Sequence, residues 1–505
     1  MMEQVHSKIT QKVLTGAGSA QTKIGARLDL KSFAKRVLNV TPICHIGGVE
    51  NTETECKVTG KVITRAIFID ETDSYNSEER TDEFAVVLPN TGFAGVLPSA
   101  RIIESNSDKY TKSESDTISG IQCEHLVGVS LAGLKPTEVT YLTDIRGEEV
   151  EVKHTDREIC TFNEVVTEKF DIGEIFKLDS NVEGVLGVEL NATVRDIVCK
   201  DDKSTVKGVA VVGVSVVRGT DEGRQIIQNM TYDFEFSKTL KRGGEIACGN
   251  VAVADCVIKI EHREKPELVL DATLLFTGAG LTYQTVKSVA DAIAPKHEID
   301  FGSATITSCA TTKQHAILAD VEGNVSLGNN APFMSRVLWA NCGTVSNVSV
   351  KPADDKVIVE GVLNANLVYE CEEKNIHTHT VEVPFSVNVK IDGASTEHSI
   401  GANVVPLTCN IKARRGKELL VDARLGVTVF GDKKVPCELV SAATEGAQRP
   451  TTGASIIIHV VGAGETLWDL AKRTGISTRE IAKQNGGVET LTGGERIVTY
   501  KQRAV

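Results

Sequence analysis

Residues 357–369 read Val-Ile-Val-Glu-Gly-Val-Leu-Asn-Ala-Asn-Leu-Val-Tyr, a largely alternating run of apolar and polar side chains around Gly361. This period of two is typical of a half-buried β-strand, and β-branched residues favour extended backbone. The same pattern occurs at 55–69 around Gly60 and at 204–217 around Gly208. The three glycines lie about 150 residues apart. The chain therefore contains three copies of one long unit, in each of which the glycine indicates a bulge or a close backbone approach.

The second and third copies also agree further along the chain. Cys256–Ile260 matches Cys409–Ala413, and both lead through a charged hairpin into another apolar strand, whereas the first copy is divergent at the corresponding place, 123–129. A period of this length is too long for a solenoid and suits a complete domain. The sequence thus predicts a mainly β protein with three tandem β-sandwich-like antiparallel domains, at 1–146, 151–294 and 299–445, and a linker at 446–454.

The last part of the chain, 455–505, has a different plan. A β-branched strand at 456–461 is followed by a turn in which Thr466 can cap a short helix, 467–473, that Gly475 ends. A second cap at Ser477 or Thr478 opens a helix at 479–484, and a closing strand follows at 496–500. The predicted order is strand, helix, helix, strand.

The residues of this module resemble the LysM family: His459-Val460-Val461-x-x-Gly464-Glu465-Thr466-Leu467-Trp468-Asp469-Leu470-Ala471, then Gly475-Ile476-Ser477, Ile481-Ala482-x-x-Asn485, and Leu491-x-x-Gly494-Glu495-x-Ile497. LysM modules bind glycans that contain N-acetylglucosamine, such as peptidoglycan, in a groove between two loops. The resemblance implies that this groove is lined by Gly464, Glu465, Thr466 and Leu467 on one side and by Asn485, Val488 and Leu491 on the other. The sequence departs from the family at Gly493–Glu495, where Pro-Gly-Gln is usual, and the loop around Gly486 is short.

Trp468 has two interpretations. As a large ring it could simply pack on the apolar side of the two-helix module. With polar neighbours, it could instead be an exposed hot spot for a sugar or a protein partner. The residues leave both interpretations open.

The triplicated unit resembles the SPOCS domain, which occurs in sporulation proteins of Clostridia and commonly precedes one C-terminal LysM module. The resemblance rests on the strand that ends in Tyr369 and on the later strand Leu419–Leu425, while the Pro-Asp-x-Lys-Pro segment of the family is replaced by Leu28–Ser32. It implies a non-enzymatic scaffold in spore-coat assembly, located in the mother-cell cytoplasm at the forespore surface, whose LysM module docks to the coat basement-layer ATPase or another envelope protein.

Composition limits the other classes. The formal net charge of −13, without a cluster of Lys and Arg, argues against nucleic-acid binding. No apolar run opens the chain and none reaches eighteen residues, so we expect neither a secretion signal nor a membrane span. The twelve cysteines are scattered singly, often in apolar strands, which indicates reduced core residues.

No set of residues indicates catalysis, a metal or a cofactor. His377 and His379 would share one face of a strand, but no further zinc ligand can be named, so a polar strand face is the better interpretation. Glycine-rich spots such as 277–280 lack the Lys and Ser or Thr of a phosphate loop. Besides the scaffold, two alternatives remain: a peptidoglycan-binding protein with a β-domain stalk, and, less favoured, a hydrolase with a LysM targeting tail.

Overall fold

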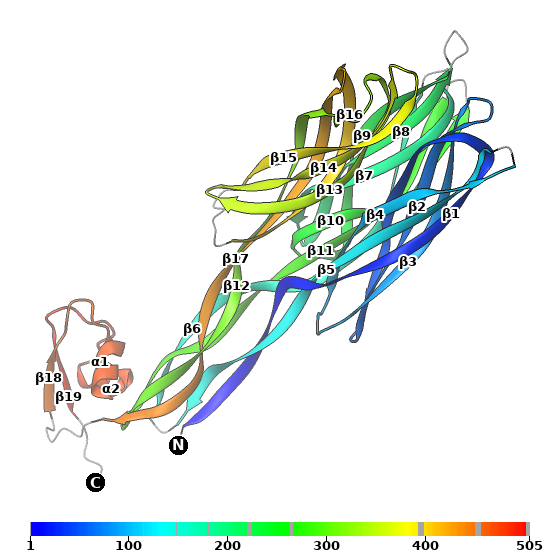
Figure 1. Ribbon diagram of the computed structural model, residues 1–505. Helices are drawn as coiled ribbons and strands as arrows, with labels where there is room; N and C mark the ends of the chain where they lie inside the picture. Colours follow the sequence, from blue (N-terminus) through cyan, green and yellow to red (C-terminus); the bar gives the residue numbers. More distant parts are fainter. Residues whose placement is uncertain are drawn as a thin grey trace.

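The computed structural model describes residues 2–114, 116–147, 149–178, 182–219, 225–262, 266–391, 398–449 and 456–500. Strands form almost all of it, and the two helices lie near the C-terminal end (Figure 1). The prediction of a mainly β protein that ends in a small two-helix module is therefore confirmed.

The first repeat forms one antiparallel sheet with the order β3-β2-β1-β5-β4. The first half of β1 pairs with β5 as far as Ala34, and the second half, from Ala34 onward, pairs with β2. β1 thus connects two parts of the sheet. The bounds of the strands are β1 Glu3–Asn51, β2 Glu55–Asp70, β3 Tyr75–Pro89, β4 Val96–Lys112 and β5 Ile118–Arg146.

The second and third repeats use the same strand pairings, but the long first strand is divided in two. Each therefore forms two three-stranded sheets, β7-β8-β9 with β10-β11-β6, and β13-β14-β15 with β12-β17-β16. In the second repeat the strands are β6 Glu151–Lys177, β7 Val182–Lys200, β8 Lys203–Gly219, β9 Gln225–Gly243, β10 Ile246–His262 and β11 Pro266–Ile293. In the third they are β12 His297–Ser326, β13 Met334–Ala353, β14 Lys356–Cys371, β15 Ile376–Lys390, β16 His398–Arg415 and β17 Glu418–Gln448.

The repeated glycine lies under an aromatic ring in every copy. Gly361 pairs with Phe385 of the neighbouring strand, and a Cβ at Gly361 would lie 2.7 Å from the ring Cζ. The matching distances are 2.5 Å for Gly60 and Phe84 and 2.2 Å for Gly208 and Phe236. A ring that covers a glycine in this way protects the exposed backbone of the strand. The facing strand also changes register at each glycine, between Ile46 and Gly48, Val194 and Asp196, and Ser346 and Ser349, so a close approach and a bulge occur together at all three positions.

The ends of the long strands form a stalk (Figure 1). We use this name for three antiparallel ribbons: 3–14 with 134–146, 151–162 with 281–293, and 297–309 with 434–448. Side chains from all three repeats meet inside it, among them Ile9, Ile159 and Ile306, which are buried together. The rest of the β-structure, called the head here, contains one core made by the third repeat alone and one made by the second repeat alone. The core of the first repeat also includes Ala254 and Leu275 of the second, and Leu38, Leu186 and Trp339, each from a different repeat, are buried together. The repeats thus share buried cores in the head as well as in the stalk.

The end of β17 differs from the expected linker. Residues 446–448 continue the strand, and Gln448 pairs with His297. Of the proposed linker, residue 449 is the one described residue that lies outside the strand. Small side chains such as Gly446 and Ala447 suggest a linker by composition, but ladder pairing with β12 overrides that preference. Residues 450–455 of the proposed linker and module start lie outside the described part.

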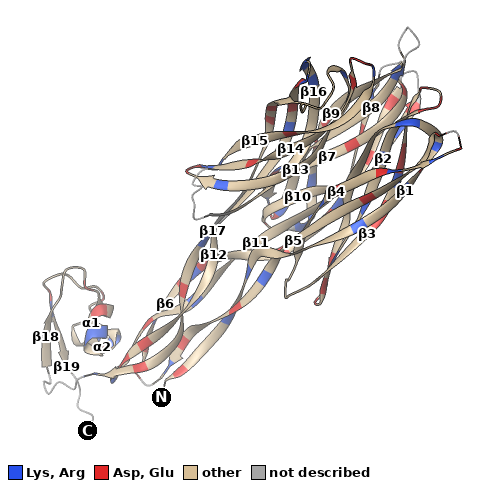
Figure 2. Cartoon of the chain, in the orientation of Figure 1, with Lys and Arg blue, Asp and Glu red and all other residues tan. Residues whose placement is uncertain are grey.

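Charged side chains of both signs are distributed along the strands without a basic stripe (Figure 2). Within the described residues no helix is long and apolar enough to cross a membrane. Seven of the twelve cysteines are buried.

Candidate functional site

The C-terminal module consists of a two-stranded antiparallel sheet and two short helices. β18 (Ile456–Val460) pairs with β19 (Arg496–Tyr500), and α1 (Leu467–Thr474) and α2 (Thr478–Gln484) follow each other between them. The hydrophobic core of the module comprises Val461, Leu470, Ala471, Ile481 and Ile497, together with Ile293 from the end of β11. The strand, helix, helix, strand order matches the sequence prediction.

Helix α1 begins with a complete capping box. Thr466 Oγ1 accepts a hydrogen bond from the Asp469 backbone N–H at 3.2 Å, and Asp469 Oδ2 accepts one from the Thr466 N–H at 2.9 Å. Hydrogen bonds from Thr466 lower the pKa of the Asp469 carboxyl below its ordinary value. Gly475 ends the helix at φ +68°, the left-handed conformation that favours glycine. Ser477, rather than Thr478, caps α2.

The first side of the predicted groove, from Gly464 to Leu467, is used mainly to build the module. Glu465 accepts a hydrogen bond from the Gly462 N–H at 2.8 Å and forms an ion pair with Arg473 at 2.9 Å. Thr466 caps α1, and Leu467 packs against the module core. Gly464 is exposed, with φ +77° and open space around its Cα. Only the backbone at Gly464 remains free of such a role.

The second side of the predicted groove is also occupied by internal contacts. Both N–H groups of the Asn485 amide donate to backbone carbonyls, to Ile481 O at 2.8 Å and to Val498 O at 2.7 Å. Its Oδ1 accepts from the Val498 N–H at 2.8 Å, so this side chain connects α2 with β19. Val488 and Leu491 pack on the core. The side chains that the resemblance places in a glycan groove thus stabilise the fold.

Trp468 lies between the module and the stalk. The ring packs partly on the module core, and its Nε1–H donates to Asp291 Oδ2 of β11 at 3.0 Å. Lys472 Nζ, one helical turn further, lies 2.8 Å from both oxygens of Asp291. Lys153 Nζ lies 5.7 Å from the centre of the ring, on its face. Neither interpretation of Trp468 from the sequence included this contact with a distant strand.

Further hydrogen bonds attach the module to the end of the stalk. The Thr478 N–H donates to Glu151 Oε2 at 2.7 Å, and its hydroxyl donates to the other oxygen of the same carboxylate. Arg449 Nη1 donates to Lys472 O at 2.7 Å and its Nε to Ala294 O at 3.0 Å. No local pattern indicates Glu151 or Ala294 as partners of the module, because both are far from it along the chain.

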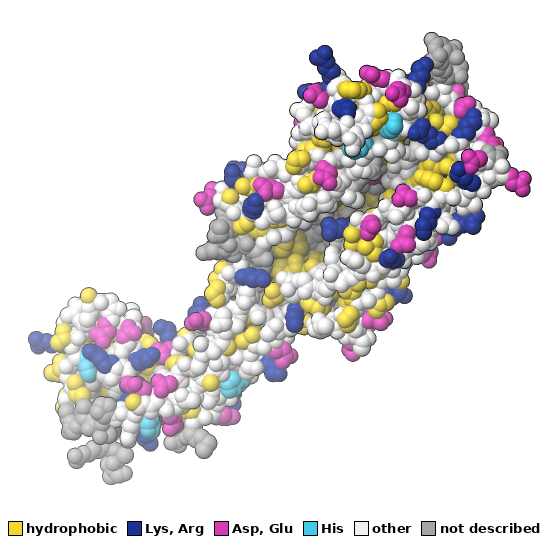
Figure 3. All heavy atoms as spheres, viewed as in Figure 1, with side chains coloured by type: hydrophobic (Ala, Val, Ile, Leu, Met, Phe, Trp, Pro, Cys, Tyr) yellow, Lys and Arg dark blue, Asp and Glu magenta, His cyan; other side chains and the backbone are white. Residues whose placement is uncertain are grey.

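One face of the module is largely apolar, and none of the other described residues covers it. Ile456, Ile458 and Val460 of β18 are 66, 62 and 63% exposed, and Tyr500, which pairs with Ile456, is 43% exposed. Paired residues of an antiparallel ladder project from the same face, and alternate residues along a strand share it. We call Ile456, Ile458, Val460, Val498 and Tyr500, together with the exposed Arg496 that pairs with Val460, the outer face of the module. Figure 3 shows hydrophobic side chains at the surface on this side. The β-branched run Ile456–Ile458 predicted the strand, but it does not alternate in polarity and so could not indicate which face is exposed.

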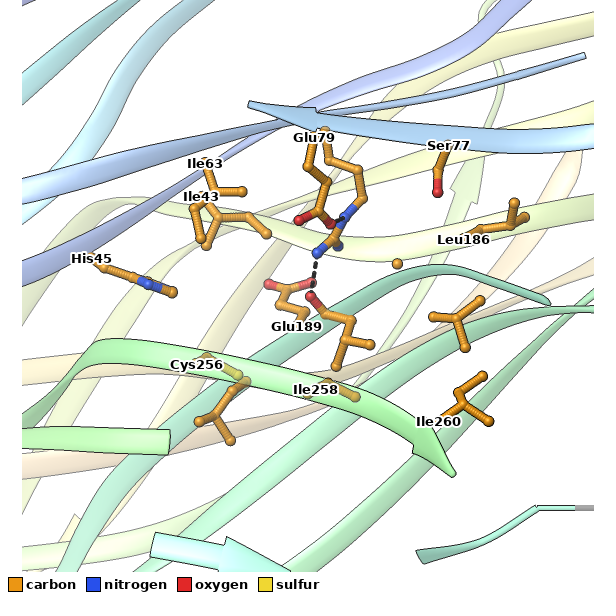
Figure 4. A pocket seen from close by; sticks show the side chains of 15 residues that line it. Ile43, His45, Ile63, Ser77, Glu79, Leu186, Glu189, Cys256, Ile258 and Ile260 are labelled. Carbon is orange, nitrogen blue, oxygen red and sulfur yellow. Dashed lines mark hydrogen bonds and ion pairs between the residues drawn. The ribbon is translucent and has the colours of Figure 1, made fainter. Parts of the chain in front are cut away.

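A pocket of about 320 Å³ lies where the first two repeats meet (Figure 4). Arg65 of β2 crosses it, pairs with Glu79 and donates to Val188 O of β7 at 2.6 Å. Burial raises the pKa of Glu189 on the same wall. Burial, aided by the nearby Lys61, lowers the pKa of His45 to about 4. These polar groups connect two repeats.

Among the described residues, no three His, Cys, Asp or Glu side chains are grouped so that they could hold a metal ion. His377 and His379 both lie on β15, where the His377 ring is 5.6 Å from the ring of Tyr369.

Comparison with known proteins identifies two parts of the chain. Residues 334–413 match the family described as the SipL SPOCS domain, and residues 459–490 match the LysM domain. The chain matches no curated protein. It is similar to one solved structure, the crystal structure of the di-domain ARO/CYC BexL from the BE-7585A biosynthetic pathway. The identity is 6%, over 51% of this chain and 85% of that one, and the TM-score of 0.07 carries no argument.

The SPOCS match covers most of the third repeat, from the start of β13 to the end of β16. The LysM match runs from β18 through both helices to the loop before β19. The chain therefore has the architecture of a SPOCS protein with a C-terminal LysM module.

Proposed function

We propose that this protein is a non-enzymatic scaffold of the spore envelope whose LysM module docks to a protein partner through its outer face. The carrying observation is the exposure of Ile456, Ile458 and Val460 on an uncovered sheet. Contiguous apolar side chains at a surface commonly mark protein interaction sites. The proposed partner is the ATPase of the coat basement layer or another envelope protein, and the proposed location is the mother-cell side of the forespore surface.

Two further observations support a protein partner over a glycan. The Asn485 amide and the Glu465 carboxylate, which would face a sugar in the predicted groove, make hydrogen bonds within the module. The aromatic ring nearest to that groove, Trp468, is engaged with Asp291 of the stalk. Peptidoglycan binding, which the LysM match suggests, remains the second candidate function, and the exposed backbone around Gly464 favours it.

The decisive experiment compares two charge substitutions on exposed valine or isoleucine residues. Ile458→Arg changes the outer face, and Val435→Arg changes a 38% exposed site on the stalk as a matched control. Binding of each purified full-length variant to the coat ATPase is measured by interferometry. We expect at least a tenfold weaker complex for Ile458→Arg and unchanged affinity for Val435→Arg.

Equal affinity of both variants would contradict the outer face as the docking site. Purified peptidoglycan provides the second arm of the experiment. If the wild-type chain sediments with peptidoglycan and N-acetylglucosamine oligomers abolish this co-sedimentation, the result favours the glycan-binding function. If no sugar-dependent sedimentation is found, the glycan-binding function is excluded.

A further inference from the structure

A large groove opens in the head, far from the module, where all three repeats meet. It has a volume of about 1020 Å³ and is lined by segments of β1, β4, β7, β10, β11, β13, β14, β15 and β16. In the view of Figure 3 the surface of the head is hollowed between its two sides. The volume lies at the upper limit of the usual range for a small-molecule site and is sufficient for several residues of an extended peptide.

The walls of this groove are mainly the edges of strands. Residues 98–104 of β4 and 39–46 of β1 line it as consecutive runs, and shorter consecutive runs come from β7, β10 and β16, at 189–192, 250–253 and 402–406. Successive side chains of a strand point to opposite faces of its sheet. A consecutive run can therefore line one groove only if the strand presents its edge. The groove is accordingly lined by backbone as well as by side chains.

These edges are unpaired in the described part of the chain. β4 is the last strand of its sheet and pairs with β5 alone, and β7, β10, β13 and β16 are also terminal strands. The second half of β1, residues 36–51, pairs with β2 on one side, while its pairing with β5 on the other side stops at Ala34. Unpaired edges offer N–H and C=O groups to another extended chain.

The two main edges run in opposite directions. β4 and the first half of β1 are both antiparallel to β5, but the second half of β1 folds back over the first half, so that Ile46 packs with Ile24, and Val40 with Leu28. An extended segment that is antiparallel to β4 is therefore parallel to this part of β1. The preferred antiparallel pattern with such a segment is thus available at the edge of β4.

The side chains of the groove also favour a polypeptide over a sugar or a nucleotide. No Phe, Trp or Tyr lines it, so the large rings on which sugars and bases usually stack are absent, and its aromatic groups are the imidazoles of His45 and His379. Its polar side chains are mainly neutral amides and hydroxyls, such as Asn250, Asn403 and Thr380, with apolar Val251 and Val253 between them. Groups that both donate and accept match the alternating polarity of a peptide backbone.

We propose that the groove binds an extended polypeptide segment of a partner, which adds as a strand to the edge of β4 at residues 98–104. Main-chain hydrogen bonds supply the affinity, and the apolar positions of β10 select small or β-branched side chains on the segment. This site is separate from the outer face of the module and does not depend on the function proposed for it.

The test uses the full chain and a displayed library of random seven-residue peptides. A selected peptide is labelled, and its affinity is measured by fluorescence anisotropy. It is then synthesised with single N-methyl groups at each position in turn, because strand addition uses the N–H groups of alternate residues. We expect at least a tenfold loss of affinity for N-methylation at every second position and little change at the positions between.

Two neighbouring proline substitutions provide the matched pair on the protein. In Ala100→Pro and Arg101→Pro, one proline removes an N–H that faces β5 and the other an N–H that faces the groove, because the two directions alternate along β4. The proline variant that removes the groove-facing N–H should keep the wild-type melting temperature and lose peptide binding. The control Ala100→Ser should retain peptide binding. Loss of folding in both variants would leave the peptide series to decide.

Three results would overturn the proposal. They are an N-methyl series without alternation, displacement of the peptide by N-acetylglucosamine oligomers, and a dimer of the chain in light scattering that the peptide does not dissociate.

Discussion

Asp291, near the end of β11, accepts a hydrogen bond from the indole N–H of Trp468 at 3.0 Å, although the two residues belong to different parts of the chain. The same carboxylate forms an ion pair with Lys472 of α1, and the Asp291 side chain is only 19% exposed. This one acidic group therefore joins the stalk to the first helix of the module.

Removal of the Asp291 carboxylate should loosen the module. Asp291→Ala leaves the Trp468 N–H without its acceptor, and a hydrogen bond of this kind contributes about 1 kcal/mol. Trp339 and Trp468 are the two tryptophans of the chain. In a Trp339→Phe background, we expect the emission of Trp468 to shift to longer wavelength. Asp271→Ala, at an exposed position of the same strand, is the control and should leave the emission unchanged.

A double-mutant cycle distinguishes the indole hydrogen bond from the lysine contact. Trp468→Phe retains a ring beside Lys153 but removes the donor to Asp291. Combined with Asp291→Ala, which removes the acceptor, it should give a coupling energy of about 0.5–1.5 kcal/mol in chemical unfolding of the full chain. A coupling energy of zero would show that Asp291 acts on Lys472 alone.

Stability should depend on pH through His45. Burial lowers its pKa in the folded chain to about 4, against 6.5 for the ordinary side chain. Between these values the unfolded chain binds more protons, so stability falls as pH decreases from 6.5 to 4, by roughly 3 kcal/mol at most. Unfolding midpoints in urea at several pH values should show this slope, and it should be weaker in His45→Gln. If His45→Gln showed the same dependence of stability on pH as the wild type, the dependence could not be assigned to His45.

Glycine 361 should resist substitution. The Cβ of Gly361→Ala would lie 2.7 Å from the Phe385 ring and 3.2 Å from Ser346 O, so we expect a loss of about 1–3 kcal/mol. Gly401, on β16 of the same repeat, has open space at its Cβ position, and Gly401→Ala should be neutral. Thermal melting of both variants measures the difference.

The shared core of the stalk should couple the three repeats. Ile159 of the second repeat is fully buried with Ile9 of the first and Ile306 of the third. Ile159→Ala should cost about 2–5 kcal/mol. Hydrogen exchange should then increase in β1 and β12 as well as in β6. Val389→Ala, in the head core of the third repeat, should increase exchange in that repeat alone.

Local patterns were sufficient to predict much of this structure. The alternation around Gly361, the cap at Thr466 and the stop at Gly475 each depend on neighbouring residues, and their elements formed as expected. The position of Trp468 depends on Asp291 and Lys153, which precede it by a long stretch of chain, and no local pattern contains that information. Likewise, the family resemblance named Asn485 as a groove residue, but its amide is required by β19.

The long ribbons of the stalk also fix the distance between the module and the head. β17 runs through 31 residues from the head to the foot of the stalk, which corresponds to roughly 100 Å at the rise of an extended strand. The module is attached at one end by Asp291 and Glu151, and the groove lies in the head at the other. A molecule of this form is a spacer of fixed length, so two layers held at its ends would keep a constant gap between them.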